Sequence, residues 1–416
     1  MPTSLQRPEG RERPEGRELP GDRAVPAPAA SRPAPEGRPL KVLQVTPDLK
    51  AGGLQRVVLD LAYGLNALGQ ETHVCSLRGP GPLGAELGER GVRVHPMPWP
   101  ERGADRLLFL KVLRLLRGER FDVVHTHNTQ AFFDGGLAAL LARVPARVHT
   151  DHARAFPDKL RYMLMERMIS PAYHRVVGVS AHTAENLRKY EGISPARLTV
   201  IQNGIDGAWY RGERDKLDRE ALRKRAGLDQ FTRVFGLGVR LEEQKGIAFL
   251  IEAMPAILAR HPGAGLAIAG SGSQEAALKQ GARRIGVEEH VRFLGPFPEL
   301  TAFYPLLDFY VLPSLWEGLP LCLLEAMSLG LPMVATRVGG VGGLLEHGRQ
   351  ALLVAPGDPA ALADAILEVL ADFPRAEAMG REGRALFDSR FDSAVMVQCY
   401  LDLYRACLGP RPTETT

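Results

Sequence analysis

Residues 313 to 334, PSLWEGLPLCLLEAMSLGLPMV, constrain the fold of this chain more than any other stretch. The preceding run FYVL, residues 309 to 312, is continuously apolar like a buried strand, and Leu321 to Leu329 has the periodicity of a buried helix. Pro320 suits the first helical turn, and Gly330 suits the position just after the last turn. The stretch therefore predicts a strand, a tight loop and a helix, which is the repeating unit of a parallel α/β sheet.

Two carboxylates lie in this unit, Glu317 in the loop and Glu325 inside the helix. A carboxylate in an apolar helix is costly unless other groups satisfy it. In one interpretation Glu325 bonds a neighbouring loop and Glu317 is solvated. In the other, both bind a hydroxyl-rich ligand, such as a sugar and a ribose, beside a helix N-terminus that offers N–H groups to a diphosphate. No Asp-x-Asp pair or histidine cluster stands beside them in sequence, so no metal site is predicted here.

The run WEGLPLCLLEAMSLGLPMVAT resembles the whole EG-x-P-x-x-x-x-EAM-x-x-G-x-P-V-V-A-T block of retaining glycosyltransferase family 4, the glycosyl transferases group 1. The resemblance implies the GT-B fold, in which two doubly wound, Rossmann-like parallel-sheet α/β domains face a central cleft. It also implies that Glu317, Gly318, Leu319 and Glu325 bind the donor, with Glu317 near the reacting sugar and Glu325 on the ribose.

Size and composition agree with a two-domain globular protein. The chain has 416 residues, of which 45% are hydrophobic and 24% are charged, enough for two full cores. The net charge of +4 comes from interspersed signs and indicates no nucleic-acid surface. Its scattered cysteines form neither a zinc-binding spacing nor a disulfide framework, so we expect a cytoplasmic protein; they are Cys75, Cys322, Cys399 and Cys407.

Residues 1 to 38 have no apolar core like that of a signal peptide, and no apolar run approaches the ~20 residues that cross a bilayer. Any membrane association is therefore expected to be peripheral, at the inner face. Because RPEGRE repeats at 7–12 and 13–18 and large apolar side chains are scarce, residues 1 to 38 are predicted to be a disordered tail. The Leu-rich helix Arg106 to Arg117 is interpreted as covering a sheet, although its basic side would also suit an anionic membrane.

Residues 39 to 205 are predicted to form an N-terminal α/β domain on the acceptor side. The strand KVLQVT at 41 to 46, the Gly52-Gly53 loop and a following helix begin a βαβ unit. Glycines at such a turn allow a ligand to approach the backbone closely, but the pattern is not GxGxxG. By the resemblance, Gly52 and Gly53 are the glycine pair that lines the donor and acceptor site.

Histidines follow two neighbouring predicted strands, in His125-Thr126-His127-Asn128 and in His149-Thr150-Asp151-His152. The carboxyl ends of parallel strands are where open α/β sheets bind ligands. The runs DVVHTHN and HTDHAR resemble family segments, the second of which contributes a histidine that faces the donor sugar. His152 is the first candidate for that histidine and His149 is the rival. His127, Asn128 and His149 are candidates on the acceptor side.

Residues 206 to 385 are predicted to form the C-terminal, donor-binding α/β domain. In GVRLEEQKG, Arg240 and Lys245 follow a strand, where two cations can neutralise a diphosphate and the arginine can bind it bidentately. The alternative is a solvated Arg–Glu–Lys loop. The run resembles the family segment G-R-L-x-x-x-K-G, with valine in place of the usual glycine before the arginine. The resemblance assigns Arg240 and Lys245 to the diphosphate, and Gly270 and Gly272 to the donor.

The boundaries between these parts are also predictions. Because of the charged segment 211 to 225, the linker is predicted to lie near residues 205 to 230. Residues 386 to 416 are predicted to contain a helix, 386 to 407, and a short tail. By the resemblance, this helix crosses back to the first domain, as the final helix of a GT-B protein does.

The resemblance implies transfer of a hexose-type sugar, with retention, from a nucleotide-diphosphate-sugar donor to a hydroxyl of a sugar or lipid-linked acceptor. It implies no metal ion or other cofactor, and a role in bacterial cell-envelope polysaccharide or glycolipid synthesis. The catalytic candidates are Glu317, His152, Arg240 and Lys245. Two alternatives stay open: a sugar-nucleotide epimerase or phosphorylase on the same fold, and a non-catalytic nucleotide-sugar binding protein. The donor base, the sugar, the acceptor and the oligomeric state are not predicted.

Overall fold

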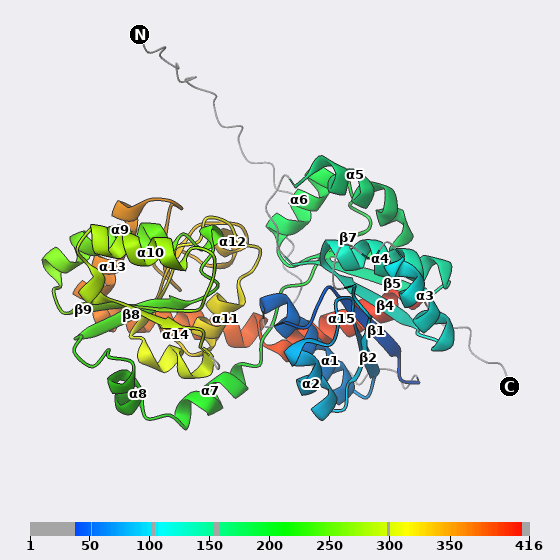
Figure 1. The fold of residues 1–416 in the computed structure, drawn as a ribbon, viewed down its shortest axis with the longest axis horizontal. Helices are drawn as coiled ribbons and strands as arrows, with labels where there is room; N and C mark the ends of the chain where they lie inside the picture. Colours follow the sequence, from blue (N-terminus) through cyan, green and yellow to red (C-terminus); the bar gives the residue numbers. More distant parts are fainter. Residues whose placement is uncertain are drawn as a thin grey trace, which may run out of the picture. The chain divides into compact units, whose positions relative to one another are not determined.

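The computed structural model describes residues 38–50, 52–100, 105, 107–152, 158–297 and 300–409, and these residues form two parallel sheets (Figure 1). The tail predicted for residues 1 to 38 lies outside the described residues, apart from Arg38, and so does the short tail after residue 409. Within the described ranges, no helix combines the length and the apolar character needed to cross a membrane.

The first sheet has seven strands in the order β3-β2-β1-β4-β5-β6-β7. Its strands are β1 (Lys41–Thr46), β2 (Glu71–Ser76), β3 (Arg93–Pro96), β4 (Val123–His127), β5 (Ala146–Asp151), β6 (Arg175–Gly178) and β7 (Leu198–Val200). Its helices are α1 (Gly53–Ala67), α2 (Gly81–Glu89), α3 (Leu108–Gly118), α4 (Asn128–Leu141), α5 (Leu160–Ile169) and α6 (Ala181–Glu191). Because the strand order reverses between β1 and β4, the sheet is doubly wound.

The second sheet has six strands in the order β10-β9-β8-β11-β12-β13, so it reverses between β8 and β11. Its strands are β8 (Arg233–Gly238), β9 (Ala264–Ala269), β10 (Val291–Gly295), β11 (Phe309–Leu312), β12 (Met333–Thr336) and β13 (Leu352–Val354). Its helices are α9 (Ile247–Arg260), α10 (Glu275–Arg284), α11 (Leu321–Ser328), α12 (Val341–Leu344), α13 (Pro359–Ala371) and α14 (Phe373–Arg390). Two parallel Rossmann-like sheets are the fold class that the sequence predicts.

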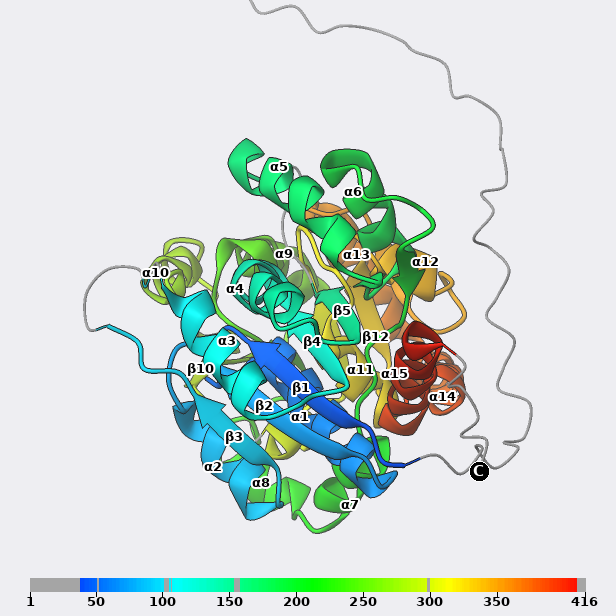
Figure 2. The ribbon, with the colours of Figure 1, turned by 90° about the vertical axis from the view of Figure 1, so that its right-hand side faces the viewer.

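Helices cover both faces of the first sheet (Figure 2), which explains why its inner strands are buried at successive positions without alternation. Val123 of β4 joins a core cluster with residues of α1, whereas the next residue, Val124, joins a second cluster with α3 and α4. In α3, Leu108, Val112 and Leu116 are buried in that second cluster. The Leu-rich helix therefore covers the sheet, as the sequence interpretation favours.

The segment predicted to hold the linker is folded into two helices, α7 (Gly207–Asp215) and α8 (Arg219–Arg225). The side chain of Asp308, just before β11, binds Arg219 and Arg223 of α8, each at 2.8 Å. Two charges of this segment are consequently ion-paired to the residue that precedes β11, which the sequence alone did not indicate.

The predicted helix 386 to 407 is interrupted, which corrects its predicted start. Helix α14 ends at Arg390, and α15 (Ser393–Leu408) begins after Asp392, whose carboxylate accepts a hydrogen bond from the Ala394 N–H at 2.9 Å. Helix α15 packs against α1 and β5 of the first sheet. The helix that contacts the first sheet thus starts at Ser393.

Two segments of the chain, one at residue 205 and one at residue 392, meet beside the start of α15. Ile205 forms an isolated parallel bridge with Asp392. Its N–H donates to the carbonyl of Phe391 at 3.0 Å, and its carbonyl accepts from the N–H of Ser393 at 2.9 Å. The segment that leaves the first sheet and the segment that returns to it therefore lie side by side.

Candidate functional site

Four loops at the carboxyl edge of the second sheet are held together by backbone hydrogen bonds. They follow β8, β9, β11 and β12, where an open α/β sheet binds its ligands. The connecting bonds run from the N–H of Leu241 to Ser271 O (2.9 Å), from Leu315 to Gln244 O (2.8 Å) and from Gly340 to Gly318 O (2.9 Å). The predicted donor-binding segments are thus brought into one loop cluster.

Close backbone approach explains two glycines of this cluster. Gly246 has φ 60°, and a Cβ atom there would lie 2.1 Å from the carbonyl oxygen of Pro313. Gly339 has φ 47°, and a Cβ atom there would lie 1.7 Å from the carbonyl oxygen of Glu317. Only glycine fits at these contacts. Gly270 and Gly272, both predicted donor residues, pack in the same way against the loop after β8.

Lys245 and Glu317, predicted separately from two motifs, form one ion pair. Nζ of Lys245 lies 2.5 Å from Oε1 of Glu317, which also accepts a hydrogen bond from Oγ of Ser314 at 2.8 Å. Their side chains are only 12% and 5% exposed. Glu317 is therefore buried and paired, so the interpretation of a solvated Glu317 was wrong.

The surroundings of Lys245 favour its charged form, whereas Arg240 lies at the surface. Burial disfavours the charged form, but the nearby Cys322 and Glu317 side chains outweigh it, and the pKa of Lys245 is raised above its usual value. Arg240 follows β8 and is exposed. Lys245 is therefore not a solvated loop residue, whereas Arg240 is exposed at the edge of the loop cluster.

Glu325 has partners that no motif indicated. Its Oε1 accepts a hydrogen bond from the hydroxyl of Tyr210 at 2.8 Å, and its Oε2 accepts one from the hydroxyl of Tyr304. Burial raises the pKa of Glu325, although both hydroxyls and Arg56 oppose that shift. A ribose hydroxyl would have to share an oxygen that a tyrosine already uses, which its second lone pair permits.

The loop that begins at Glu317 leads into α11, the helix that contains Glu325. Gly318 and Leu319 are buried, and in the described part of the chain neither N–H donates to a backbone carbonyl. Gly53, the first residue of α1, lies beside α11, because a Cβ atom there would be 3.7 Å from Cδ1 of Leu321. Gly52 precedes Gly53, and both glycines are exposed. The predicted glycine pair and the predicted glutamate block are therefore close in the structure.

Alternation along β4 and β5 separates the candidate histidines. His127 and His152 lie on one face, with Nδ1 of His127 2.9 Å from Nε2 of His152. His149 lies on the other face, where its Nδ1 is 2.9 Å from Oγ1 of Thr126. The structure thus brings His127 and His152 together and directs His149 away from them.

The hydrogen bonds of this pair determine where its protons lie. Nε2 of His127 is 2.7 Å from Oε1 of Gln44, so that nitrogen donates and Nδ1 of His127 accepts from Nε2–H of His152. Nδ1 of His152 is then a buried acceptor with no hydrogen-bond partner among the described residues. Asn128, an acceptor-side candidate, instead accepts the backbone N–H of His152 at 3.1 Å.

Two doubly wound parallel sheets are the architecture of a GT-B protein. Residues 51–209 match the family model described as Glycosyltransferase Family 4, and residues 232–372 match the one described as Glycosyl transferases group 1. The chain therefore belongs to glycosyltransferase family 4, and it is a glycosyltransferase that uses nucleotide-sugar donors. The resemblance seen in the sequence is confirmed.

Relatives and solved structures extend over most of the chain. The UDP-Gal:alpha-D-GlcNAc-diphosphoundecaprenol alpha-1,3-galactosyltransferase of Escherichia coli is 30% identical over 277 residues, 64% of this chain and 71% of that protein. Glycogen synthase of Mycobacterium tuberculosis is 29% identical over 415 residues, 90% of this chain and 97% of that protein. Among crystal structures, Anabaena HepE in complex with UDP and glucose has a TM-score of 0.77 at 22% identity, covering 88% of this chain and 99% of that one.

Proposed function

We propose that the protein transfers a hexose-type sugar from a nucleotide-diphosphate donor to a hydroxyl acceptor, with retention and without a metal ion. The observation that carries the proposal is the buried pair of Lys245 and Glu317 beside the exposed Arg240. This arrangement places fixed positive charge next to a carboxylate at the edge of the sheet where ligands bind. A diphosphate leaving group needs such positive charge in the transition state.

In the proposed reaction, Arg240 and Lys245 bind the diphosphate, with the amides of Gly318 and Leu319. Glu317 keeps Lys245 in place and uses its second oxygen for a hydroxyl of the donor sugar. No residue of this cluster is proposed as a covalent nucleophile. The incoming hydroxyl would attack from the side that the diphosphate leaves, which preserves the anomeric configuration.

His152 is proposed as the histidine that faces the donor sugar. The buried Nδ1 of His152, which has no partner among the residues that the structure describes, can accept a hydrogen bond from a sugar hydroxyl, and the contact with His127 orients the ring. Burial lowers the pKa of His152 to about 3, which keeps this nitrogen an acceptor at neutral pH. The role of His149 as the rival is not supported by its contacts.

For the donor base we propose uridine, and for the acceptor a lipid-linked sugar of cell-envelope synthesis. The support is the name of the Escherichia coli relative, which transfers galactose from UDP-Gal to a diphosphoundecaprenol-linked sugar.

The experiment is a thermal-shift panel with UDP, GDP and ADP, each with EDTA and with magnesium. A nucleotide at a hundred times its dissociation constant should add about 2.7 kcal/mol to the free energy of unfolding. We expect UDP alone to raise the melting temperature, equally in both conditions, and Arg240→Gln to lose most of this shift. A change at Arg240 is preferable to one at Glu325, whose loss would leave two buried tyrosine hydroxyls unpaired.

Arg284→Gln is the matched control, because Arg284 is exposed on α10 outside the loop cluster. It should keep the full UDP shift. A shift that needs magnesium would contradict the metal-free site. No shift with any nucleotide would contradict the assignment of the loop cluster to the donor.

We also propose that the protein associates peripherally with anionic membranes, through α5 rather than α3. Large apolar side chains on one face of α5 are exposed: Leu160 (67%), Leu164 (50%), Met165 (44%) and Met168 (79%). Lys159, Arg161 and Arg167 beside them are exposed as well. An apolar face flanked by cations suits the interface of an anionic bilayer.

Flotation with vesicles tests this second proposal. The protein should float with vesicles that contain phosphatidylglycerol and should remain at the bottom with phosphatidylcholine alone. The double variant Leu164→Ser with Met168→Ser should lose most of the binding. Leu68→Ser, which removes an exposed leucine outside α5, should retain it. Equal flotation of both variants would rule out α5 as the contact.

A further inference from the structure

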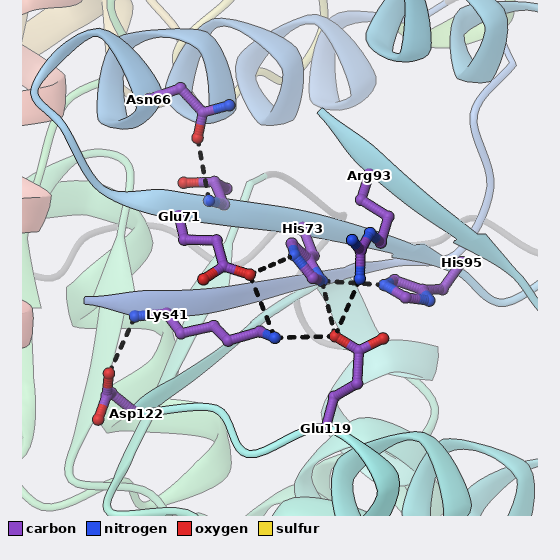
Figure 3. Close-up of polar contacts among 9 residues, drawn as sticks. Lys41, Asn66, Glu71, His73, Arg93, His95, Glu119 and Asp122 are labelled. Atoms are coloured by element: carbon purple, nitrogen blue, oxygen red, sulfur yellow. Dashed lines mark hydrogen bonds and ion pairs between the residues drawn. The ribbon is translucent and has the colours of Figure 1, made fainter. Parts of the chain in front are cut away.

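A second group of polar side chains lies on β2, on β3 and just after α3, and it has no part in the proposed transfer (Figure 3). His73 belongs to β2, His95 belongs to β3, and Glu119 follows α3 where the chain approaches β4. One donor atom from each lies within 4.8 Å of the other two. Three separate elements therefore present metal-binding atoms to one point.

The distances within this group match those around a small tetrahedral ion. Nδ1 of His73 lies 3.0 Å from Nε2 of His95 and 3.5 Å from Oε2 of Glu119. With Zn²⁺ bonds of about 2.0–2.1 Å, neighbouring donor atoms of a tetrahedral site are about 3.3 Å apart. Two histidines and a carboxylate are also a donor set that proteins use for Zn²⁺, with water as the fourth ligand.

A further carboxylate orients His73 in the way that metal-binding histidines are usually oriented. Oε1 of Glu71 lies 3.0 Å from Nε2 of His73, so Nε2 carries the proton and Nδ1 directs its lone pair toward the group.

We propose that His73, His95 and Glu119 bind one Zn²⁺ ion, with Glu71 as the residue that positions His73. The ion would tie β2 and β3 to the end of α3. It would lie on the first sheet, whereas the proposed diphosphate site lies on the second, so it is compatible with a metal-free transfer reaction.

Two cations compete for the same carboxylate oxygen. Nζ of Lys41 is 2.9 Å and Nη1 of Arg93 is 3.5 Å from Oε2 of Glu119. Lys41 has a second partner in Glu71 at 3.1 Å, and the side chain of Arg93 is 63% exposed, so both can yield Oε2 to an ion. Their charge still opposes Zn²⁺. Removing the charge of Arg93 should therefore tighten zinc binding.

The test is metal binding by the full-length protein after treatment with EDTA and removal of the chelator. Calorimetric titration with Zn²⁺ should show one saturable site, and Co²⁺ should give the intense visible bands of a four-coordinate ion. His95→Gln should abolish this site. Glu71→Gln should weaken zinc affinity by roughly 10- to 100-fold, the usual effect of removing such an orienting partner. Arg93→Gln should strengthen it.

His182→Gln is the control, because His182 is exposed on α6 outside the group, and it should bind as the wild type does. His95 is partly exposed, and circular dichroism will establish that its variant is folded. A wild type that takes up no zinc overturns the proposal, and so does a folded His95→Gln variant with unchanged affinity. All these readouts are independent of sugar transfer, so this proposal can fail while the proposed function stands.

Discussion

His152 and its neighbours are buried imidazoles, and their burial makes stability depend on pH. The pKa of His152 is lowered by burial to about 3, and burial lowers the pKa of His125 and His127 in the same direction. In the unfolded chain a histidine takes up a proton below about pH 6.5. Because only the unfolded state binds that proton, stability is lost as the pH falls from about 6.5 toward about 3.

This dependence is measurable as the slope of the free energy of unfolding against pH. His152→Gln should reduce the slope between about pH 6.5 and 4 by at most about 1.4 kcal/mol per pH unit. Urea unfolding of both proteins at several pH values provides the measurement, with His182→Gln as a control that leaves the slope unchanged. Burial raises the pKa of Asp60 to about 7, which gives a slope of opposite sign. The slope of the wild type therefore combines both contributions, and the difference between wild type and His152→Gln isolates that of His152. Identical slopes for wild type and His152→Gln would contradict the assignment of a buried, neutral imidazole.

The positions of the candidate site residues were predictable from motifs, whereas their partners were not. Spacing within the chain indicated Lys245 and Glu317 separately, but their contact depends on how two loops pack. The tyrosines that bind Glu325 come from α7 and from a 3₁₀ turn near residue 304, and neither carries a recognisable pattern. Side-chain alternation alone separates His149 from His152, whereas placing His127 beside His152 also requires the register of β4 against β5, in which His127 is opposite Thr150.

At the scale of elements, the loop after β8 can pack closely against the loop after β11 because Gly246 has no side chain. Gly246→Ala should lower the free energy of unfolding by at least about 1–2 kcal/mol, since alanine at φ 60° is strained and its Cβ would meet the carbonyl of Pro313. It should also weaken UDP binding, because Lys245 is the adjacent residue. Urea unfolding and calorimetric titration measure the two effects.

Gly281→Ala in α10 is the matched control, because nothing lies within 4 Å of the Cβ that it would add. That variant should be more stable by about 0.5–1 kcal/mol, as alanine favours a helix interior over glycine. If Gly246→Ala were equally stabilising, the close approach of the two loops would be refuted.

Strands and helices with strong apolar patterns were predicted well, and the failures share a cause. The segment β11 to α11 lies where its periodicity predicts it. Helices α7 and α8 within the predicted linker were not predicted, because ion pairs that stabilise them, such as Arg223 with Asp308, join residues far apart in sequence. The break at Asp392 was missed because a capping aspartate resembles any exposed polar residue of a continuous helix.

At the scale of the whole molecule, α15 completes the core of the first sheet. The hydroxyl of Tyr404 lies 2.7 Å from Nδ1 of His125, and that of Tyr400 lies 2.9 Å from Oγ1 of Thr150. Tyr404→Phe should lower the free energy of unfolding by about 1–3 kcal/mol, because it leaves a buried ring nitrogen without its partner. Hydrogen exchange should then be faster in β4 and β5.

Tyr162→Phe is the control for this change, because the hydroxyl of Tyr162 contacts only an exposed arginine in the described structure. It should change stability by less than about 0.5 kcal/mol. Unchanged stability and exchange in Tyr404→Phe would mean that α15 contributes little to the first sheet.

The order of βα units predicted two parallel sheets, because successive strand–loop–helix repeats place their strands in parallel and their helices on the faces of the sheet. The return of the final helix to the first sheet came from the resemblance alone. No local pattern in residues 393 to 408 distinguishes a helix that covers its own sheet from one that covers another.

The bridge between Ile205 and Asp392 has a consequence for how the chain is divided. Since residues 205 and 392 are adjacent in space, everything between them is an insertion whose two ends already meet. The remaining chain, residues 39 to 205 with α15, is a complete parallel sheet with helices on both faces. Joining Ile205 to Asp392 through a short glycine linker, in place of the residues between them, would therefore leave the first-sheet part as one continuous chain and separate it from the second-sheet part. Either part could then be exchanged between relatives without a change in the length of any other loop.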